Sequence, residues 1–421
     1  MLMAEHIKNN NPKSLVCPFC PLHCDDIVVN TNNKKFTLPN TRSVKCSKRI
    51  ESFNINKRSL FVPRVKNIET TISSALNKTK KEITKNNEIL VLNHGTDMSG
   101  IRSMLNFASH HNAIIDHVNS KFLHQNIGVI QRTGYMATSL MEVKNRADLI
   151  VIFGNDILDK TPRLLDKIFL SSNSLWTKNS KKEIILVGEF SSRTVAKIKN
   201  KCSVINIKIK LDLIPEFIKT IDSCKMNKDL KISNNIIIKV NKIVKKAKYM
   251  VATWSASDFI KTSNAEIIIS SIAKFVVEIN NYRRAACLSI SGNLGDATSS
   301  QVLTWTTGFP SRLKYLNGSF SHDKNSFNGL ELIKNKNIEL VIHINSLSMN
   351  KLELDSKLTN IVIGHPNSKF SSMPDIFIPI GIPGIDHRGI MFRTDNVVSV
   401  HLKKIRDIKL PTLKYIFDGL I

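Results

Sequence analysis

The chain has 421 residues, enough for roughly two or three domains, and a formal net charge of +27. No apolar run approaches the roughly 20 residues of a membrane-spanning helix, and DIFIPIGIPGI, one of the longest, is broken by prolines. The lysines are spread along the chain among many asparagines, without Lys/Arg runs interleaved with aromatic residues. Composition therefore argues against a membrane partner and against a nucleic-acid partner.

The first feature along the chain is a cysteine motif. Four of the seven cysteines lie in the first 46 residues: Cys17, Cys20 and Cys24 in CPFCPLHCDDI, and Cys46 in VKCSKRI. Four thiolates on a short, loop-rich stretch suit an iron–sulfur cluster or a structural zinc ion. The spacing favours a [4Fe-4S] cluster, because Cys46 has no second cysteine three residues away as in a zinc knuckle. A zinc ion and a vestigial, empty site stay open as alternatives.

The residues before this motif, MLMAEHIKNNNPKS, do not resemble a secretory signal. We therefore expect a cytoplasmic protein. Cysteines stay reduced in that compartment, so disulfides are the least favoured interpretation of the motif.

From about residue 88, short apolar stretches alternate with amphipathic segments, which is typical of a parallel α/β sheet. The stretches predicted as strands of a first sheet are 88–95, 113–118, 147–156, 183–189 and 204–210. Those predicted for a second sheet are 249–254, 285–292, 338–345 and 359–365. The amphipathic segment KISNNIIIKVNKIVKKAK predicts a helix at the boundary between the two units.

These patterns predict four parts of the chain. Residues 1–65 form an N-terminal cysteine-cluster segment, 66–230 a first α/β domain and 231–370 a second α/β domain. Residues 371–421 form an extended segment that returns to the core. No other catalytic motif is found: the chain has no G-x-S-x-G, no phosphate-binding G-x-x-x-x-G-K-[ST] and no H-E-x-x-H. His117 and His124, seven residues apart, are a weak candidate for a separate metal site.

Four stretches carry a resemblance to a known family. They are CPFCPLHCDDI, GVIQRTGYMATSLMEVKNRADLIVIFGND (128–156), GNLGDATSSQVLTWTTGFP (292–310) and GHPNSKFSSMPDIFIPIGIPGIDHRGIMFR (364–393). Together they resemble the B subunit of formylmethanofuran dehydrogenase, a molybdopterin oxidoreductase of the formate dehydrogenase type. The resemblance implies domains I–III of the formate dehydrogenase/DMSO reductase fold: a cysteine-cluster segment and two Rossmann-like parallel-sheet units. It also implies that the C-terminal domain that closes over the pterin is lacking.

One position departs from this family. In its redox-active members, a cysteine that binds molybdenum or tungsten follows the strand that corresponds to AIIDHV. The corresponding run here is DHVNSKFLH (116–124), in which Phe122 stands at the ligand position. Phenylalanine offers no lone pair to a metal. We therefore expect no catalytic residue in this chain and no molybdopterin or tungsten.

Two more positions are suggested by the resemblance. Lys48 resembles a basic residue that lies between cluster and pterin in redox-active members, and its alternative is a surface position. His365, in Gly-His-Pro, is either a remnant of a dinucleotide pocket or an ordinary turn residue.

With these departures, the chain resembles more closely the B subunit of the formyltransferase/hydrolase complex of methylotrophic bacteria. That resemblance implies a non-redox scaffold in the oxidation of formaldehyde to formate through tetrahydromethanopterin. The implied partners are an amidohydrolase-like A subunit, a C subunit and a formyltransferase D subunit. A polyglutamylated methanofuran-type carrier would bind to the complex, and its acidic tail would be attracted by a basic surface.

Two alternatives to the scaffold stay open. The first is a redox-active B subunit of formylmethanofuran dehydrogenase that binds a tungsten or molybdenum pterin through a non-protein ligand. The second is an unrelated iron–sulfur or zinc module that binds nucleic acid.

Overall fold

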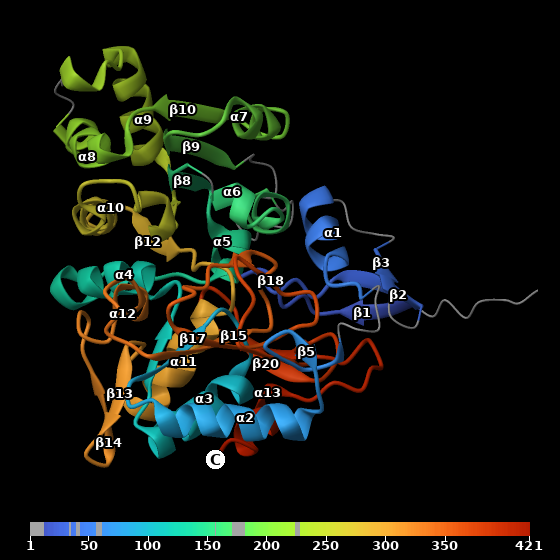
Figure 1. The fold of residues 1–421 in the computed structure, drawn as a ribbon. Coiled ribbons are helices and arrows are strands. Elements are labelled where there is room, and N and C mark those ends of the chain that lie inside the picture. The colour runs from blue at the N-terminus through green and yellow to red at the C-terminus, as the bar shows by residue number, and fades with distance from the viewer. Residues whose placement is uncertain are drawn as a thin grey trace, which may run out of the picture. The chain divides into compact units, whose positions relative to one another are not determined.

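The computed structural model describes residues 12–32, 35–38, 43–55, 61–155, 157–170, 182–223 and 228–421. Among these residues, no helix has the length and apolar character needed to cross a membrane. The chain divides into two compact units (Figure 1). Unit 1 consists of residues 1–120, 293–393 and 399–421, and unit 2 of residues 121–292 and 394–398.

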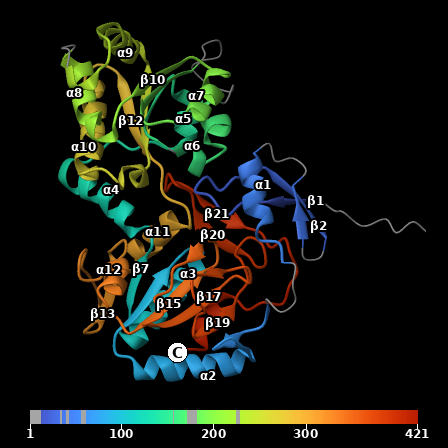
Figure 2. The ribbon, with the colours of Figure 1, turned by 45° about the horizontal axis from the view of Figure 1, so that its top comes forward.

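Unit 1 is built on a nine-stranded sheet in which β7, β6, β15, β17 and β19 run parallel (Figure 2). The strand order is β14-β13-β7-β6-β15-β17-β19-β4-β5. The strands are β4 (Arg64–Val65), β5 (Ile68–Glu69), β6 (Ile89–Asn93), β7 (Ile114–His117), β13 (Leu313–Leu316), β14 (Ser319–His322), β15 (Leu340–Asn345), β17 (Thr359–Gly364) and β19 (Ile376–Pro379). The central strands are continuous aliphatic runs because both faces of a parallel sheet are buried.

Helices cover both faces of this sheet, and the alternation of side chains along each strand decides which residues meet them. Ile89 and Val91 of β6 face a core shared with α2, α3, α11 and α13, whereas Leu90 and Leu92 face the side of α12. The helices of unit 1 are α1 (Val44–Glu51), α2 (Ile72–Lys85), α3 (Met98–His111), α11 (Asp296–Thr307), α12 (Gly329–Lys334) and α13 (Leu413–Asp418).

Smaller sheets complete unit 1. An antiparallel three-stranded sheet, in the order β1-β2-β3, frames the cysteine motif, and two strand pairs lie in the C-terminal third of the chain. The strands are β1 (Pro12–Leu15), β2 (Ile27–Asn32), β3 (Lys35–Thr37), β16 (Lys351–Leu352), β18 (Lys369–Phe370), β20 (Gly389–Phe392) and β21 (Ser399–Leu402).

A buried ion pair fastens the C-terminal segment of unit 1 to its N-terminal part. Arg406, which is 2% exposed, donates from Nε and Nη2 to the two carboxylate oxygens of Asp386, at 2.7 and 3.0 Å. Its Nη1 donates to the carbonyl oxygen of Phe53, 353 residues earlier, at 2.9 Å. The guanidinium therefore joins two distant segments in a buried place.

Unit 2 is built on a parallel five-stranded sheet in the order β10-β9-β8-β11-β12. Its strands are β8 (Leu149–Gly154), β9 (Glu183–Gly188), β10 (Val204–Lys208), β11 (Tyr249–Trp254) and β12 (Arg284–Ser289). Its helices are most of α4 (Ser120–Thr133), then α5 (Leu140–Arg146), α6 (Ile157–Lys160), α7 (Ser192–Lys199), α8 (Ile214–Ser223), α9 (Asn234–Lys246) and α10 (Ala265–Asn280).

The prediction of an α/β protein with two parallel-sheet units is confirmed, but the predicted grouping of the strands is wrong. Strands β6 and β7 pair with β15, β17 and β13, whereas β8, β9 and β10 share their sheet with β11 and β12. The compact units therefore cross the boundaries predicted at residues 230 and 370, because residues 121–292 are inserted into unit 1. Apolar runs of similar length carry no information about which strand each will pair with.

Two further expectations can be compared with the structure. The predicted amphipathic helix is confirmed as α9, but it lies within unit 2 rather than at a boundary. The segment 371–421, predicted as extended, holds the strands β19, β20 and β21. Helix α13 at its end was missed, although Thr412 is a capping residue that accepts the N–H of Tyr415.

Candidate functional site

The four predicted cysteine ligands lie in two elements of unit 1. Cys17, Cys20 and Cys24 occupy the loop between β1 and β2, and Cys46 lies in the first turn of α1. The Cys17 N–H donates to the Cys24 carbonyl at 2.9 Å, which closes the loop. His23 has a positive φ of 42°, and its Nδ1 lies 3.0 Å from the Cys17 carbonyl oxygen, so the turn is held from within.

The electrostatics show that these thiols lie near one another. Burial, with smaller contributions from the neighbouring thiols of Cys24 and Cys46, raises the pKa of Cys20 to about 12, against the opposing effects of the Leu22 N–H and the Arg49 guanidinium. Burial, together with the neighbouring thiols, also raises the pKa of Cys17. The thiolates would repel one another without a cation between them, as in any polythiolate metal site.

This donor set can be compared with the groups it was predicted to hold. Across the described part of the chain, no three His, Cys, Asp or Glu side chains stand close enough together to bind a single metal ion. A single zinc ion needs four donors within about 2.3 Å of one point, whereas each cysteine of a [4Fe-4S] cluster binds a different iron. The four thiols are soft donors on one loop and one helix turn, a donor set that suits either an iron–sulfur cluster or a zinc ion.

Of the two alternatives for Lys48, the surface position agrees with the structure, and the basic residue beside the cysteines is Arg49. Lys48 is exposed, whereas the Nη1 of Arg49 donates to the Phe19 carbonyl at 3.2 Å and its charge lowers the pKa of Cys20. The signal was available in the sequence, because Arg49 lies three residues after Cys46 and so shares its helix face.

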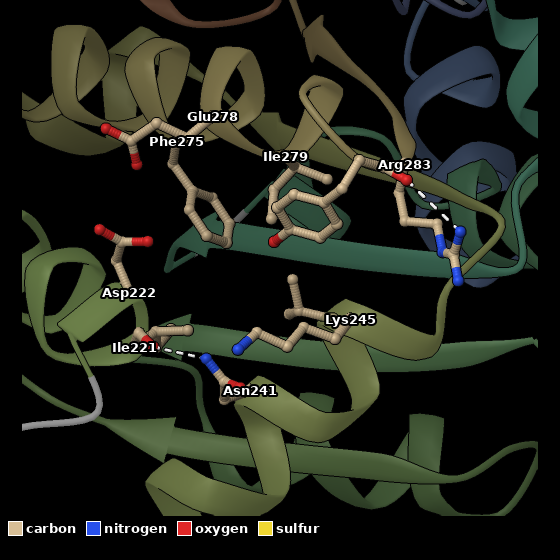
Figure 3. Close-up of a pocket in the computed structure, with 10 residues that line it drawn as sticks. Ile221, Asp222, Asn241, Lys245, Phe275, Glu278, Ile279 and Arg283 are labelled. Carbon is tan, nitrogen blue, oxygen red and sulfur yellow. Dashed lines mark hydrogen bonds between the residues drawn. The ribbon is translucent and has the colours of Figure 1, made fainter.

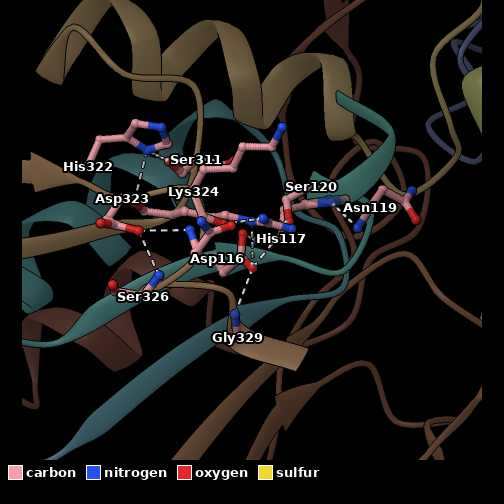
Figure 4. Close-up of polar contacts among 12 residues, drawn as sticks. Asp116, His117, Asn119, Ser120, Ser311, His322, Asp323, Lys324, Ser326 and Gly329 are labelled. Atoms are coloured by element: carbon pink, nitrogen blue, oxygen red, sulfur yellow. Dashed lines mark hydrogen bonds and ion pairs between the residues drawn. The ribbon is translucent and has the colours of Figure 1, made fainter. Parts of the chain in front are cut away.

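The run that contains Phe122 begins with a buried polar network at the end of β7 (Figure 4). Asp116 accepts the N–H groups of His117 and Gly329 at 2.8 and 2.9 Å and the Ser120 hydroxyl at 3.1 Å. Arg312 Nε lies 3.8 Å from the same carboxylate and donates to Ser120 Oγ at 3.2 Å. Asp116 thus fixes the strand end and the first residue of α4.

His117, in the same run, has both ring nitrogens engaged. Its Nδ1 accepts the Asn119 N–H at 3.0 Å, so Nε2 carries the proton and donates to the Leu294 carbonyl at 3.2 Å. Burial lowers its pKa to about 4, and the ring is neutral at physiological pH. No nitrogen lone pair is left for a metal, which argues against the predicted site at His117 and His124.

Phe122 itself lies in the first turn of α4 and is half-buried. It packs against the main hydrophobic cluster of unit 2, which includes Val129 and the fully buried Trp254. The Trp254 indole donates to Asn126 Oδ1 at 3.0 Å. Residues 122, 126 and 129 follow the spacing of one helix face, so Phe122 is one of the side chains that attach α4 to unit 2.

A second polar feature lies at the carboxyl ends of β8 and β11, where the strand order of unit 2 reverses. Ligands of open α/β sheets bind at such positions. Here the Asn155 N–H donates to Asp258 Oδ2 at 2.9 Å, and Lys160 Nζ donates to Asp258 Oδ1 at 2.8 Å. Gly154 has a φ of +130°, and a Cβ added to it would overlap the Asp258 carboxylate.

The Asp258 carboxylate therefore lies against the end of β8, at the edge of the sheet where open α/β sheets bind ligands. The resemblance implies a pterin dinucleotide in such a crevice, and its phosphates would face a buried carboxylate that already holds the nearest backbone N–H. The residues at this strand end do not fit an anionic group.

His365 is a core residue. It is fully buried, its Nε2 lies 2.6 Å from the Ser348 carbonyl oxygen and its ring packs on Phe53 with 4.8 Å between centroids. The turn interpretation of Gly-His-Pro therefore fits the structure better than a pocket-lining one.

The raised pKa of Asp116 predicts a pH dependence of stability. Burial raises this pKa from 3.8 to about 6, so the folded chain holds the proton more tightly than the unfolded chain. Asp116 then lowers the free energy of unfolding progressively as pH rises from about 4 to about 6, by about 3 kcal/mol at most. We expect Asp116→Asn to remove this slope in urea unfolding measured between pH 4 and pH 7.

A matched control for this measurement is Asp323→Asn. Asp323 is fully exposed, and hydrogen bonds from the N–H groups of Ser326 and Asn325 lower its pKa. Its effect on the free energy of unfolding has the opposite sign, because its stabilising contribution is lost as pH falls. This loss occurs at pH values below the ordinary aspartate pKa. An Asp116→Asn slope equal to that of the unmodified chain would contradict the assignment.

The fold and the sites described above define an α/β protein with two parallel-sheet units. It has a four-cysteine segment and, at the end of β7, a polar network just before Phe122. No family model matches the chain. Over 416 residues, 94% of each chain, it is 20% identical to the B subunit of tungsten-containing formylmethanofuran dehydrogenase 2 of Methanocaldococcus jannaschii. The protein of the same name from Methanococcus maripaludis is 21% identical over 424 residues, 95% of this chain and 94% of that one.

Among solved structures, the chain is similar to one chain of the formyltransferase/hydrolase complex FhcABCD from Methylorubrum extorquens, crystallised in complex with methylofuran. The TM-score is 0.71 at 16% identity, with 85% of this chain and 97% of that chain covered. The chain is thus similar to the B subunit of formylmethanofuran dehydrogenase over nearly its whole length and shares the fold of a formyltransferase/hydrolase chain. The resemblance predicted from sequence is confirmed.

Proposed function

We propose that this chain is the B subunit of a formyltransferase/hydrolase complex of one-carbon metabolism, in which it serves as a non-redox scaffold. The similarity to the B subunit of formylmethanofuran dehydrogenase spans 94% of both chains, so the chain corresponds to the whole subunit rather than to one domain of it. The observation that carries the non-redox role is Phe122, a half-buried side chain that packs against the hydrophobic cluster of unit 2. The resemblance implies that this is the position at which redox-active relatives have a sulfur ligand.

The chemistry of that position supports a structural role. A thiolate is a soft anionic ligand, whereas a phenyl ring can supply only apolar contact area. The half-buried ring is part of the packing that attaches α4 to unit 2. The Asp258 carboxylate at the end of β8 adds independent support, since it disfavours a phosphate-bearing cofactor there.

The proposal includes partners and a compartment. In a cytoplasmic complex, the chain would bind an amidohydrolase-like A subunit, a C subunit and a formyltransferase D subunit. Methylofuran is the molecule bound by the similar complex of Methylorubrum extorquens. The net charge of +27 would favour a carrier with an acidic polyglutamate tail.

A [4Fe-4S] cluster held by Cys17, Cys20, Cys24 and Cys46 is also part of the proposal. When bound, it would supply four iron–thiolate bonds and neutralise the mutual repulsion of the thiolates. The loop between β1 and β2 and helix α1 would then be cross-linked, which stabilises a segment that has little core of its own.

A second candidate function is that of a redox-active B subunit. The names of both similar dehydrogenase subunits, which specify a tungsten-containing enzyme, favour it. In that case, a tungsten pterin would have to bind without a cysteine ligand at residue 122.

Metal analysis of the purified complex separates the two functions. We expect less than about a tenth of an equivalent of tungsten or molybdenum per chain, and about four irons with matching acid-labile sulfide. Near-stoichiometric tungsten or molybdenum would contradict the scaffold role. An absence of iron would overturn the cluster while leaving the scaffold role intact.

Two cysteine variants make the iron measurement specific. Cys20→Ser should lose most of the iron, because Cys20 lies among the four clustered thiols. Cys202→Ser is the control, since Cys202 lies in unit 2, outside this cluster, and its thiol contacts the Ile198 carbonyl oxygen. Equal iron loss in both variants would contradict the assignment of the ligands.

A further inference from the structure

A cavity of about 480 Å³ lies in unit 2 between helices α8, α9 and α10 (Figure 3). Its size falls within the range of about 300–1,000 Å³ typical of small-molecule sites. Its floor is apolar, formed by buried side chains that include Phe275, and its rim carries two acidic residues, two basic residues and Tyr282.

One end of the cavity is negatively charged. The carboxylates of Asp222, at the end of α8, and Glu278, on α10, lie on the same side of the Phe275 ring (Figure 3). Partial burial and the Asp222 charge raise the pKa of Glu278, against a weaker opposing effect of Lys274. Within the described residues, neither Asp222 nor Glu278 forms an ion pair within 4 Å of a basic group. Both carboxylates are therefore open to a cation.

Two aromatic rings accompany these carboxylates. Phe275 is buried in the floor, whereas Tyr282 is 48% exposed at the rim. Tyr282 lines the same cavity as the two carboxylates, and burial raises its pKa, with further contributions from the charges of Asp222 and Glu278. Aromatic faces beside carboxylates bind organic cations, because ring quadrupole and anion attract the same charge.

The opposite end of the cavity carries one positive charge. Arg283 lies there, away from the two carboxylates, whereas the Lys245 side chain on α9 extends toward Asn241 and the side of Asp222 (Figure 3). The Arg283 guanidinium is 3.4 Å from the Tyr282 carbonyl oxygen, an interaction that leaves most of its donors available. A ligand that satisfies both parts of the rim must carry a cation and an anion separated by an apolar linker.

We infer that this cavity binds a basic amino acid. Its guanidinium or ammonium group would lie between Asp222 and Glu278, its aliphatic stem would cover Phe275 and Tyr282, and its carboxylate would face Arg283. This inference does not depend on the proposed role in a formyltransferase/hydrolase complex.

Isothermal titration of the full chain with two probes tests the site. The probes are L-arginine and agmatine, which has the same guanidinium and stem but no carboxylate. We expect L-arginine to bind at least threefold more tightly than agmatine to the unmodified chain. Asp222→Asn/Glu278→Gln should weaken binding of both probes at least tenfold. Arg283→Met should weaken only L-arginine, so that the two probes become equal.

The three substituted side chains of the cavity are exposed, so the variants should keep the thermal unfolding midpoint of the unmodified chain. Arg193→Met, on α7 outside the cavity, is the control for a general loss of positive charge and should change neither affinity. Failure of both probes to bind the unmodified chain would overturn the inference. Unchanged binding by Asp222→Asn/Glu278→Gln, or equal affinity of the unmodified chain for both probes, would overturn it too.

Discussion

Replacing Arg406 with methionine should lower the free energy of unfolding by about 3–5 kcal/mol, the usual cost of breaking a buried ion pair from one side. The guanidinium satisfies both oxygens of Asp386 and the Phe53 carbonyl in a place where Arg406 is 2% and Asp386 5% exposed. Methionine would leave a carboxylate buried without a counter-ion. Chemical denaturation followed by near-ultraviolet circular dichroism would measure the change.

Two further variants identify the cause. Arg102→Met, on the exposed face of α3, is the matched control and should change the free energy of unfolding by less than about 0.5 kcal/mol. Adding Asp386→Asn to Arg406→Met should restore part of the stability, because the unpaired buried charge is removed. Equal free energies of unfolding for Arg406→Met and Arg102→Met would contradict a stabilising role of the Arg406–Asp386 ion pair in the C-terminal segment.

The second large effect is expected at Gly188, the last residue of β9. Its φ is +135°, and a Cβ there would overlap the carbonyl oxygen of Gly154 on the neighbouring strand. The Glu189 N–H donates to the same carbonyl at 3.1 Å, so the two strand ends cannot separate without breaking a hydrogen bond. Gly188→Ala should therefore lower the free energy of unfolding by at least about 3 kcal/mol, from the sum of backbone strain and overlap.

Gly134→Ala is the matched control for this substitution. Gly134 also lies in unit 2 and also has a positive φ, +63°, but nothing lies within 4 Å of the position of an added Cβ. The free energy of unfolding of Gly134→Ala should fall only by the cost of an alanine in the left-handed conformation, about 1 kcal/mol. Thermal unfolding of the two variants measures the difference, and equal midpoints would contradict the close approach of β8 and β9.

The elements of the chain were largely predictable, because strand and helix patterns are local. ADLIVIFGND (147–156) reads as a buried strand on its own, and β8 occupies its centre. The partners of each strand were not predictable. β6 and β15 lie side by side although about 250 residues separate them, and nothing in either apolar run distinguishes this partner from β8.

The candidate site shows the same division. The cysteine motif was recognisable because its spacing is local, and Arg49 could have been found from its helix position. Asp258 could not, because it reaches the Asn155 N–H from 103 residues away. The cavity between α8, α9 and α10 was also unpredictable, since its charged rim is assembled from three separate helices.

The amino-acid sequence by itself determined the α/β character of this protein, the four clustered cysteines and the phenyl ring at residue 122, since each depends on residue type and short spacing. Only the tertiary structure decided that residues 121–292 form an inserted unit, that Phe122 packs into its core and that Asp258 covers the end of β8. The reason is physical: hydrophobic burial is non-directional, so an apolar run encodes that it will be buried but not against what.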